Sequence, residues 1–229
     1  MTSVRIGALL ALLVLLPGPA SAAGGASSGG ASVYGSSPQR VRTPEEIAES
    51  RYNAGLKKRD KAWKYEAKAA QAGSEKKRAK LEKKAQKQYT KAIKDYRKAV
   101  EKNPALYQAH SALGYALRRS GRYDAALEAY DRALGLNPSY AEAIEYRAEA
   151  HLGLSRLDEA KEAYVRLFVL DRERADELMR AMERWVSARQ RDPNGLTPEV
   201  LEAFATWVRE RREIAQQAAR LSEEDSGRW

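Results

Sequence analysis

The feature that most constrains the fold of this 229-residue chain is an internal repeat with a period of 34 residues. Side chains of similar size recur at that spacing. In chain order the matched sets are Ala92, Ala126 and Ala160; Tyr96, Tyr130 and Tyr164; Ala99, Ala133 and Leu167; and Val100, Leu134 and Phe168. Asn103-Pro104 and Asn137-Pro138 close the first two copies. Self-similarity at this period predicts an array of helical repeats.

Residues 107–138 form the best-defined copy. Its spaced residues are Leu113-Gly114 in the first helix, Gly121 in the turn, and then Ala126, Tyr130, Ala133 and Pro138. This pattern resembles the tetratricopeptide repeat family over about residues 45–174. It departs from the family at His110, where a large aromatic residue is usual, and at Leu117, where tyrosine is common. The resemblance implies an all-α solenoid of stacked antiparallel helix pairs.

Physical chemistry favours the same fold. Gly114 and Ala126 are small enough to let paired helices approach closely, and Pro138 cannot continue a helix. A single pair cannot bury its apolar face, so neighbouring pairs must complete the core. We therefore expect three stacked pairs with additional helices at the C-terminal end as a cap.

The chain divides into segments of different character. Residues 1–22 combine Arg5, an apolar stretch at residues 6–16 and Ala20-Ser21-Ala22, which is typical of a cleavable secretory signal peptide. The apolar stretch is shorter than the roughly 20 residues that span a bilayer, which disfavours an uncleaved anchor. We thus expect a periplasmic or secreted protein. The further expected segments are a Gly/Ser/Ala-rich disordered leader (23–44), three repeats (45–106, 107–140 and 141–174), C-terminal capping helices (175–221) and a flexible tail (222–229).

The first repeat contains an insertion at about residues 60–88. Gly55 matches Gly114, yet Gly55 lies 37 residues before Ala92, whereas Gly114 lies 12 residues before Ala126. Gly73, near the middle of the insertion, precedes Ser74, a plausible N-cap, so we expect two lengthened helices joined by a tight turn. We also expect the contacts of this hairpin to lie outside the stack, so that the repeats fold without it.

The insertion is strongly basic. Residues 57–98 hold 17 Lys or Arg and 5 Asp or Glu, a net charge of +12, whereas the chain without residues 1–22 carries only +9. The lysines assigned to this basic hairpin are Lys61, Lys64, Lys68, Lys76, Lys77, Lys80 and Lys84. Such a surface favours binding to an anionic membrane or another envelope polymer, while a merely solvated helix pair remains an equal alternative. Nucleic acid is disfavoured because the hairpin lacks clustered aromatic residues and the protein is expected to be exported.

The sequence contains no recognisable catalytic machinery. Cysteine is absent, which excludes disulfides and thiol catalysis. The two histidines, His110 and His151, fall at packing positions of first helices, and no metal-spaced cluster, phosphate loop or nucleophile elbow occurs. We therefore expect no catalytic residues, no cofactor and no metal site.

A binding surface is better indicated. The resemblance implies that a peptide binds along a concave stripe of the first helices, for which the candidates are Tyr52, Leu56, Tyr115, Arg118, Glu142, Glu145 and Glu149. The basic and asparagine residues with which chaperone-tail-binding members hold a terminal carboxylate are not reproduced. We expect the three glutamates to make the groove acidic and to favour a ligand segment with Lys or Arg beside apolar anchors for Tyr52, Leu56 and Tyr115. The sequence thus predicts an exported, bacterial-type adaptor; the alternative is an electrostatic binder of anionic envelope surfaces through the hairpin.

Overall fold

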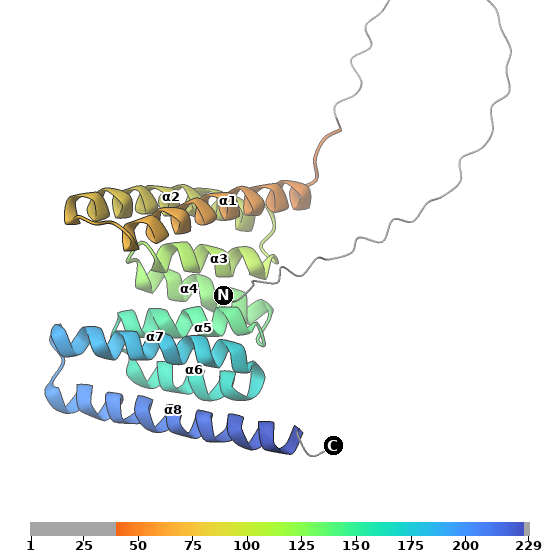
Figure 1. Ribbon diagram of the computed structural model, residues 1–229. Coiled ribbons are helices and arrows are strands. Elements are labelled where there is room, and N and C mark those ends of the chain that lie inside the picture. Colours follow the sequence, from red (N-terminus) through yellow and green to blue (C-terminus); the bar gives the residue numbers. More distant parts are fainter. Residues whose placement is uncertain (1–39, 227–229) are drawn as a thin grey trace, which may run out of the picture. The chain divides into compact units, whose positions relative to one another are not determined.

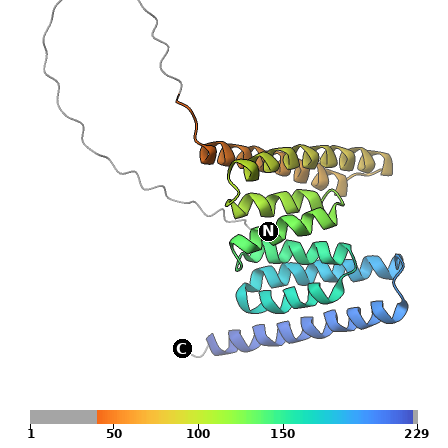
Figure 2. The ribbon, with the colours of Figure 1, turned by 180° about the vertical axis from the view of Figure 1, so that it is seen from behind.

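The structure, a computed structural model, describes residues 40–226, with side chains described through residue 221. This part of the chain contains eight helices and no strand. The helices are α1 (Pro44–Ala70), α2 (Glu75–Lys102), α3 (Tyr107–Arg118), α4 (Tyr123–Leu136), α5 (Ala141–Gly153), α6 (Leu157–Leu170), α7 (Arg172–Arg191) and α8 (Pro198–Ser226). They form antiparallel pairs stacked in chain order (Figure 1), which confirms the expected all-α repeat solenoid. Figure 2 shows the same stack from behind.

Some of the expected segments lie outside the described residues. These are the signal peptide at residues 1–22 and the leader up to residue 39. At the other end, α8 continues to Ser226, past the expected end of that helix at about Leu221.

The ends of α1 and α2 follow from local sequence. The Thr43 hydroxyl accepts a hydrogen bond from the Glu46 amide, and the Thr43 amide donates to the Glu46 carboxylate, so the two residues form a capping box. Pro44 occupies the first turn, where a missing amide proton costs nothing. Ser74 caps α2, as expected, and leaves only residues 71–74 to reverse the chain.

Each of the first two helix pairs is built around a tyrosine ring that lies against a glycine. Tyr96 packs on Gly55, and Tyr130 packs on Gly114, so closely that each ring occupies the space a Cβ atom would need. Both tyrosines are fully buried. In the third pair Ala148 takes the place of the glycine and Tyr164 is again buried. The 34-residue period therefore arises because each helix pair repeats the same contact, between a glycine or alanine of its first helix and a tyrosine of its second.

Two clusters of buried side chains form the core, one spanning α1 to α5 and the other α5 to α8. The helix α7 packs on both α5 and α6, as the first helix of a fourth pair would. The helix α8 packs on α7 through Phe204, whose ring meets Trp185 edge-on at 5.4 Å, and Trp207 meets Tyr164 of α6 at 5.7 Å. The last two helices therefore close the array as its final pair.

The expectation that the insertion lies outside the stack is wrong. Trp63 Nε1 donates a hydrogen bond of 2.7 Å to the Tyr115 hydroxyl of α3. Glu66 forms an ion pair with Arg119 at 2.5 Å, and Gln86 donates to the Arg119 carbonyl oxygen at 2.8 Å. The reason is that α1 and α2 continue straight through the insertion, so their middle portions extend over the C-terminal end of α3.

Candidate functional site

An aromatic row runs across the face that the first helices of successive pairs share. It consists of Trp63 on α1, Tyr115 on α3 and Tyr146 on α5. The rings of Trp63 and Tyr115 meet edge-on with centroids 5.9 Å apart, and those of Tyr115 and Tyr146 lie 4.9 Å apart. Tyr89 supports Tyr115 from α2 at 6.2 Å. Trp63 is 39% exposed, and the two tyrosines are half-buried, so the row is accessible at the surface.

Arginine side chains cover this aromatic row. The Arg59 guanidinium lies 4.2 Å from the centre of the Trp63 ring. Arg118 lies 5.3 Å from the Tyr115 ring and 5.4 Å from the Tyr146 ring, and Arg174 of α7 reaches Tyr146 at 6.0 Å. Cation–π contacts of this kind hold the long side chains in place. The face is therefore ordered before any partner binds.

The acidic residues of this face are paired with those arginines. Arg118 forms an ion pair with Glu149, and the two side chains are only 10% and 19% exposed. Arg174 lies 2.8 Å from Glu145, which is 4% exposed, and 3.9 Å from Glu142. The expectation of an acidic groove must be corrected, because the capping helix α7 supplies a cation that the repeat pattern did not assign to this face.

Burial changes the acidity of Glu145. Loss of hydration raises the pKa of its carboxyl group to about 7, although the hydrogen bond from Arg174 opposes the shift. A carboxyl group with a raised pKa stabilises the fold while it is protonated. That contribution is present below the unfolded pKa near 4.5 and is lost as the pH rises through about 7.

We therefore expect wild-type protein to lose about 1 to 3 kcal/mol of stability, relative to Glu145→Gln, between pH 4.5 and pH 8. Glutamine keeps the size of the side chain but has no carboxylate to desolvate. Urea unfolding of both proteins across this pH range measures the difference. If the unfolding free energies of the two proteins changed in parallel with pH, Glu145 would not titrate with a raised pKa.

The remaining sequence candidates lie toward the start of α1. Tyr52 is half-buried with its ring 6.1 Å from Tyr96, and Leu56, one turn later, is also half-buried. Burial, followed by the charge of Glu142, raises the pKa of Tyr52. The structure thus brings all seven candidate residues to the first-helix side of the stack.

Sequence reasoning missed Trp63, Tyr146 and Arg174. Trp63 belongs to the insertion, which was expected to project away from the repeats. Tyr146 follows the predicted stripe position Glu145 by one residue, and Arg174 belongs to a helix treated only as a cap. A signal was available for Trp63, because it follows Arg59 by four residues and such residues are neighbours on a helix surface.

A pocket of about 360 Å³ lies beside Arg118, the residue that covers Tyr115 and Tyr146 of the aromatic row. Arg118 and Glu149 line one side of it, and Arg184 and Trp185 of α7 line the other. It extends the candidate surface from the first three helix pairs onto the fourth.

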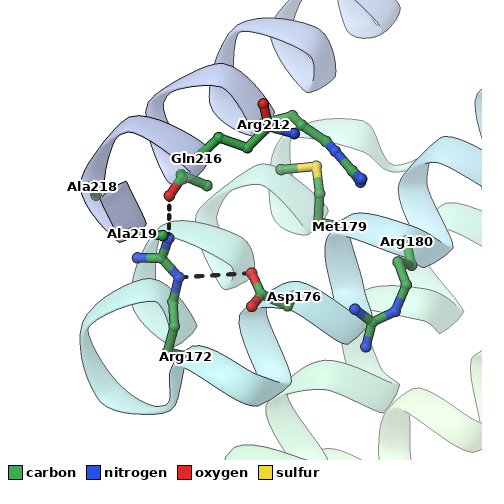
Figure 3. Close-up of a pocket in the computed structure, with 9 residues that line it drawn as sticks. Arg172, Asp176, Met179, Arg180, Arg212, Gln216, Ala218 and Ala219 are labelled. Atoms are coloured by element: carbon green, nitrogen blue, oxygen red, sulfur yellow. Dashed lines mark hydrogen bonds and ion pairs between the residues drawn. The ribbon is translucent and has the colours of Figure 1, made fainter. Parts of the chain in front are cut away.

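A second pocket, of about 430 Å³, lies between α7 and α8 at the end of the stack (Figure 3). Its basic side chains are already engaged. Arg172 lies 3.6 Å from Asp176 and donates to the Ala215 carbonyl oxygen at 2.8 Å, and Arg212 pairs with Glu183 at 2.5 Å. This polar surface is suited to capping the array rather than to chemistry.

The described residues contain neither a candidate metal site nor a candidate membrane span. Across residues 40–226 no cluster of three or more histidine, cysteine or acidic residues is placed to hold a metal ion. No helix in the same region combines the length and apolar character needed to cross a membrane.

Comparisons with known proteins identify the repeats. A family model described as Tetratricopeptide repeat matches residues 76–141 and 111–176. Similar solved structures include the first TPR domain of the human RPAP3 protein, with 22% identity over 65% of this chain and 98% of that one and a TM-score of 0.46. Another is the first TPR of Spaghetti (RPAP3) bound to the HSP90 peptide SRMEEVD, with 26% identity, 55% and 93% coverage and a TM-score of 0.39.

The MamA protein is also similar, with 23% identity over 75% of this chain and 95% of that one and a TM-score of 0.38. No curated protein sequence gave a significant match. The family match, the 34-residue register and the stacked antiparallel pairs agree with one another. The chain is a tetratricopeptide repeat protein.

Proposed function

We propose that the protein is a non-enzymatic adaptor that binds a peptide or protein segment on its first-helix face. The observation that carries the proposal is the aromatic row of Trp63, Tyr115 and Tyr146, which is ordered by arginines yet remains partly exposed. Helical repeat arrays use extended surfaces of this kind for binding. Exposed tryptophan and tyrosine side chains that are already held in place supply contact area at low entropic cost.

The charges on this face indicate the kind of ligand. Glu145 and Glu149 each lie within an ion pair, so neither offers a free carboxylate to a basic ligand. The exposed edge of Trp63 instead offers an apolar contact beside the Arg59 guanidinium. The ligand therefore has an apolar or aromatic anchor residue, and the basic residues that the sequence also predicted for it are not required.

The adaptor would act in the periplasm or outside the cell. This part of the proposal rests on the amino-acid pattern of residues 1–22, with cleavage after Ala22. Mass spectrometry of the protein recovered from the envelope or medium tests it. An intact protein beginning at Met1 inside the cytoplasm would contradict it, whereas a new N-terminus at Ala23 is the expected result.

Replacing Trp63 with alanine is expected to weaken ligand binding at least about 10-fold, because truncating a central aromatic contact removes much of the binding energy. Peptides selected from a displayed library on the wild-type protein provide the ligands, and calorimetry provides the affinities. Val169→Ala is the matched control, since Val169 is an exposed apolar residue of α6 outside the row. Peptides that bind the Trp63→Ala variant undiminished, with its helix content intact, would place the site elsewhere.

The alternative expected from the sequence, binding to an anionic envelope surface, concerns the lysines of α1 and α2. These lysines are not part of the aromatic row. The two functions therefore do not compete for the same surface.

A further inference from the structure

Lysines are concentrated on one face of the first helix pair. Of the 16 lysines in the chain, 14 lie within residues 57–98. Those spaced three or four residues apart, and therefore on one side of their helix, are Lys57, Lys61, Lys64 and Lys68 on α1, and Lys76, Lys80, Lys83, Lys87, Lys91, Lys94 and Lys98 on α2. All of them are exposed. We call this set the lysine face; Lys77 and Lys84 are exposed beside it.

No acidic side chain neutralises the lysine face. Residues 57–98 contain five acidic residues, and each is engaged elsewhere. Asp60 pairs with Arg59, Glu66 with Arg119, Glu75 and Glu82 with Arg78, and Asp95 with Lys58 and Arg51. Among the described residues, no ion pair involves a member of the lysine face. The positive charge of this surface is thus left for an external partner.

The lysine face points away from the rest of the stack. On α1 the contacts with α3 come from Trp63 and Glu66, and on α2 from Gln86 and Tyr89. With 3.6 residues per turn, the lysines of α1 lie more than a quarter turn from Trp63 and Glu66. Those of α2 lie more than a quarter turn from Tyr89 and about 60° or more from Gln86. Because the first pair stands at one end of the stack (Figures 1 and 2), the lysines cover the outer surface of that end.

The two helices hold their lysines in neighbouring rows. The Lys58–Asp95 ion pair and the hydrogen bond from Tyr89 to Glu66 define the antiparallel register. In that register Lys61 and Lys91 fall at about the same level along the two helices. The row on α2 extends from Lys76 to Lys98, which is roughly 33 Å along the helix. The result is a broad array of positive charge rather than a single stripe.

We propose that the lysine face docks on the surface of an anionic lipid bilayer. A bilayer presents negative charge in a plane, which can reach both rows together. Lysine is a hydrated point charge that needs no fixed geometry in its partner, whereas arginine suits bidentate contacts with individual phosphates. Of the nearby aromatic residues, Trp63 and Tyr89 are turned toward α3, and Tyr65 is half-buried beneath the Lys84 ammonium group. The face therefore lacks the clustered exposed rings on which nucleic-acid bases stack.

Docking through this end surface leaves the aromatic row uncovered. The row crosses α1, α3 and α5 on another side of the stack from the lysine face. The protein can therefore hold a ligand while its first helix pair lies against the membrane. This inference goes beyond the proposed adaptor function and does not require it.

Sedimentation with lipid vesicles tests the inference. The full chain without its signal peptide is expected to bind vesicles of phosphatidylcholine mixed with phosphatidylglycerol, and not vesicles of phosphatidylcholine alone. Binding falls steeply as salt is raised, because a Debye length of about 10 Å at 0.1 M screens exposed charges. In the variant Lys80→Gln/Lys83→Gln/Lys87→Gln/Lys91→Gln, the affinity for anionic vesicles is expected to fall by at least about 100-fold. The reason is that each lysine near an anionic surface contributes substantially to the binding free energy.

A matched variant separates the lysine face from net charge. Arg122→Gln/Arg132→Gln/Arg184→Gln/Arg220→Gln removes the same charge from exposed positions in the rest of the chain and is expected to bind normally. Trp63→Ala should also sediment normally, which distinguishes this surface from the aromatic row. Circular dichroism confirms that each variant folds.

Three results would overturn the inference. The first is equal binding to neutral vesicles, and the second is equal loss of binding in the lysine and arginine variants. The third is tight, lysine-dependent binding to duplex DNA by protein that leaves anionic vesicles unbound. This outcome would assign the lysine face to nucleic acid instead.

Discussion

Replacing Gly114 with leucine is expected to lower the free energy of unfolding by about 1 to 3 kcal/mol. A Cβ atom at this position would lie 2.6 Å from Cε1 and 2.8 Å from Cδ1 of Tyr130. Tyr130 is 0% exposed, so its ring cannot move into solvent to make room. The contact must be relieved by separating α3 from α4. Thermal or urea unfolding of the purified variant measures the cost.

Gly135 provides a matched control for this prediction. It lies in α4, and a Cβ atom added to it would meet no other atom within 4 Å. Gly135→Ala is expected to be neutral or to stabilise the protein by about 0.5 to 1 kcal/mol, because alanine has the higher helix propensity. If Gly114→Leu unfolded at the wild-type midpoint, the packing of Tyr130 against Gly114 would be incorrect.

Deleting residues 60–88 and joining the cut ends with a short turn is expected to cost at least about 3 kcal/mol. The deletion removes Trp63 and Glu66 from α1 and Gln86 from α2, which together contact Tyr115 and Arg119 of α3. It also exposes Tyr89, which is buried in the intact protein. We expect cooperative unfolding to shift to lower denaturant concentration or to disappear.

A shorter deletion should leave the stack intact. Residues 69–83 form the end of the hairpin, and within the described structure they make no hydrogen bond, ion pair or ring contact with α3. Removing them and joining Lys68 to Lys84 through a turn is expected to change stability by less than the longer deletion. If both deletions destabilised the protein equally, the contacts of Trp63, Glu66 and Gln86 would not be the cause.

The spacing pattern of the repeats predicted their packing because each of these contacts joins the two helices of one repeat. The first helix supplies Gly55 or Gly114 and the second supplies Tyr96 or Tyr130. The family pattern at Gly114, Ala126 and Pro138 therefore predicted helices, pairing and stacking together. The hairpin was predicted for a similar reason, since Gly73-Ser74 contains a local signal for the turn.

The binding face could be predicted only in part. Tyr115 and Arg118 were found because they occupy regular positions of a well-matched repeat. Glu145 and Glu149 were found at such positions as well, but the expectation that they leave the groove acidic was wrong, because they form ion pairs with Arg174 and Arg118. The repeat register predicts on which face of its helix a side chain lies. It does not predict which residue of another helix forms an ion pair with that side chain.

The amino-acid sequence by itself determined the helices, their pairing, the cap boxes and turns, and the concentration of lysine in residues 57–98. These properties depend on the 34-residue period, on the helix and turn propensities of short segments, and on composition. All three can be read from residues that are close together in the sequence. Only the tertiary structure decided that Trp63 lies in one row with Tyr115 and Tyr146, and that Arg174 forms an ion pair with Glu145. It also decided that Glu66 of the hairpin pairs with Arg119 of α3 instead of with a hairpin lysine. Trp63 lies 52 residues before Tyr115, and Glu145 lies 29 before Arg174, so these contacts arise only when the packed pairs bring separate helices together.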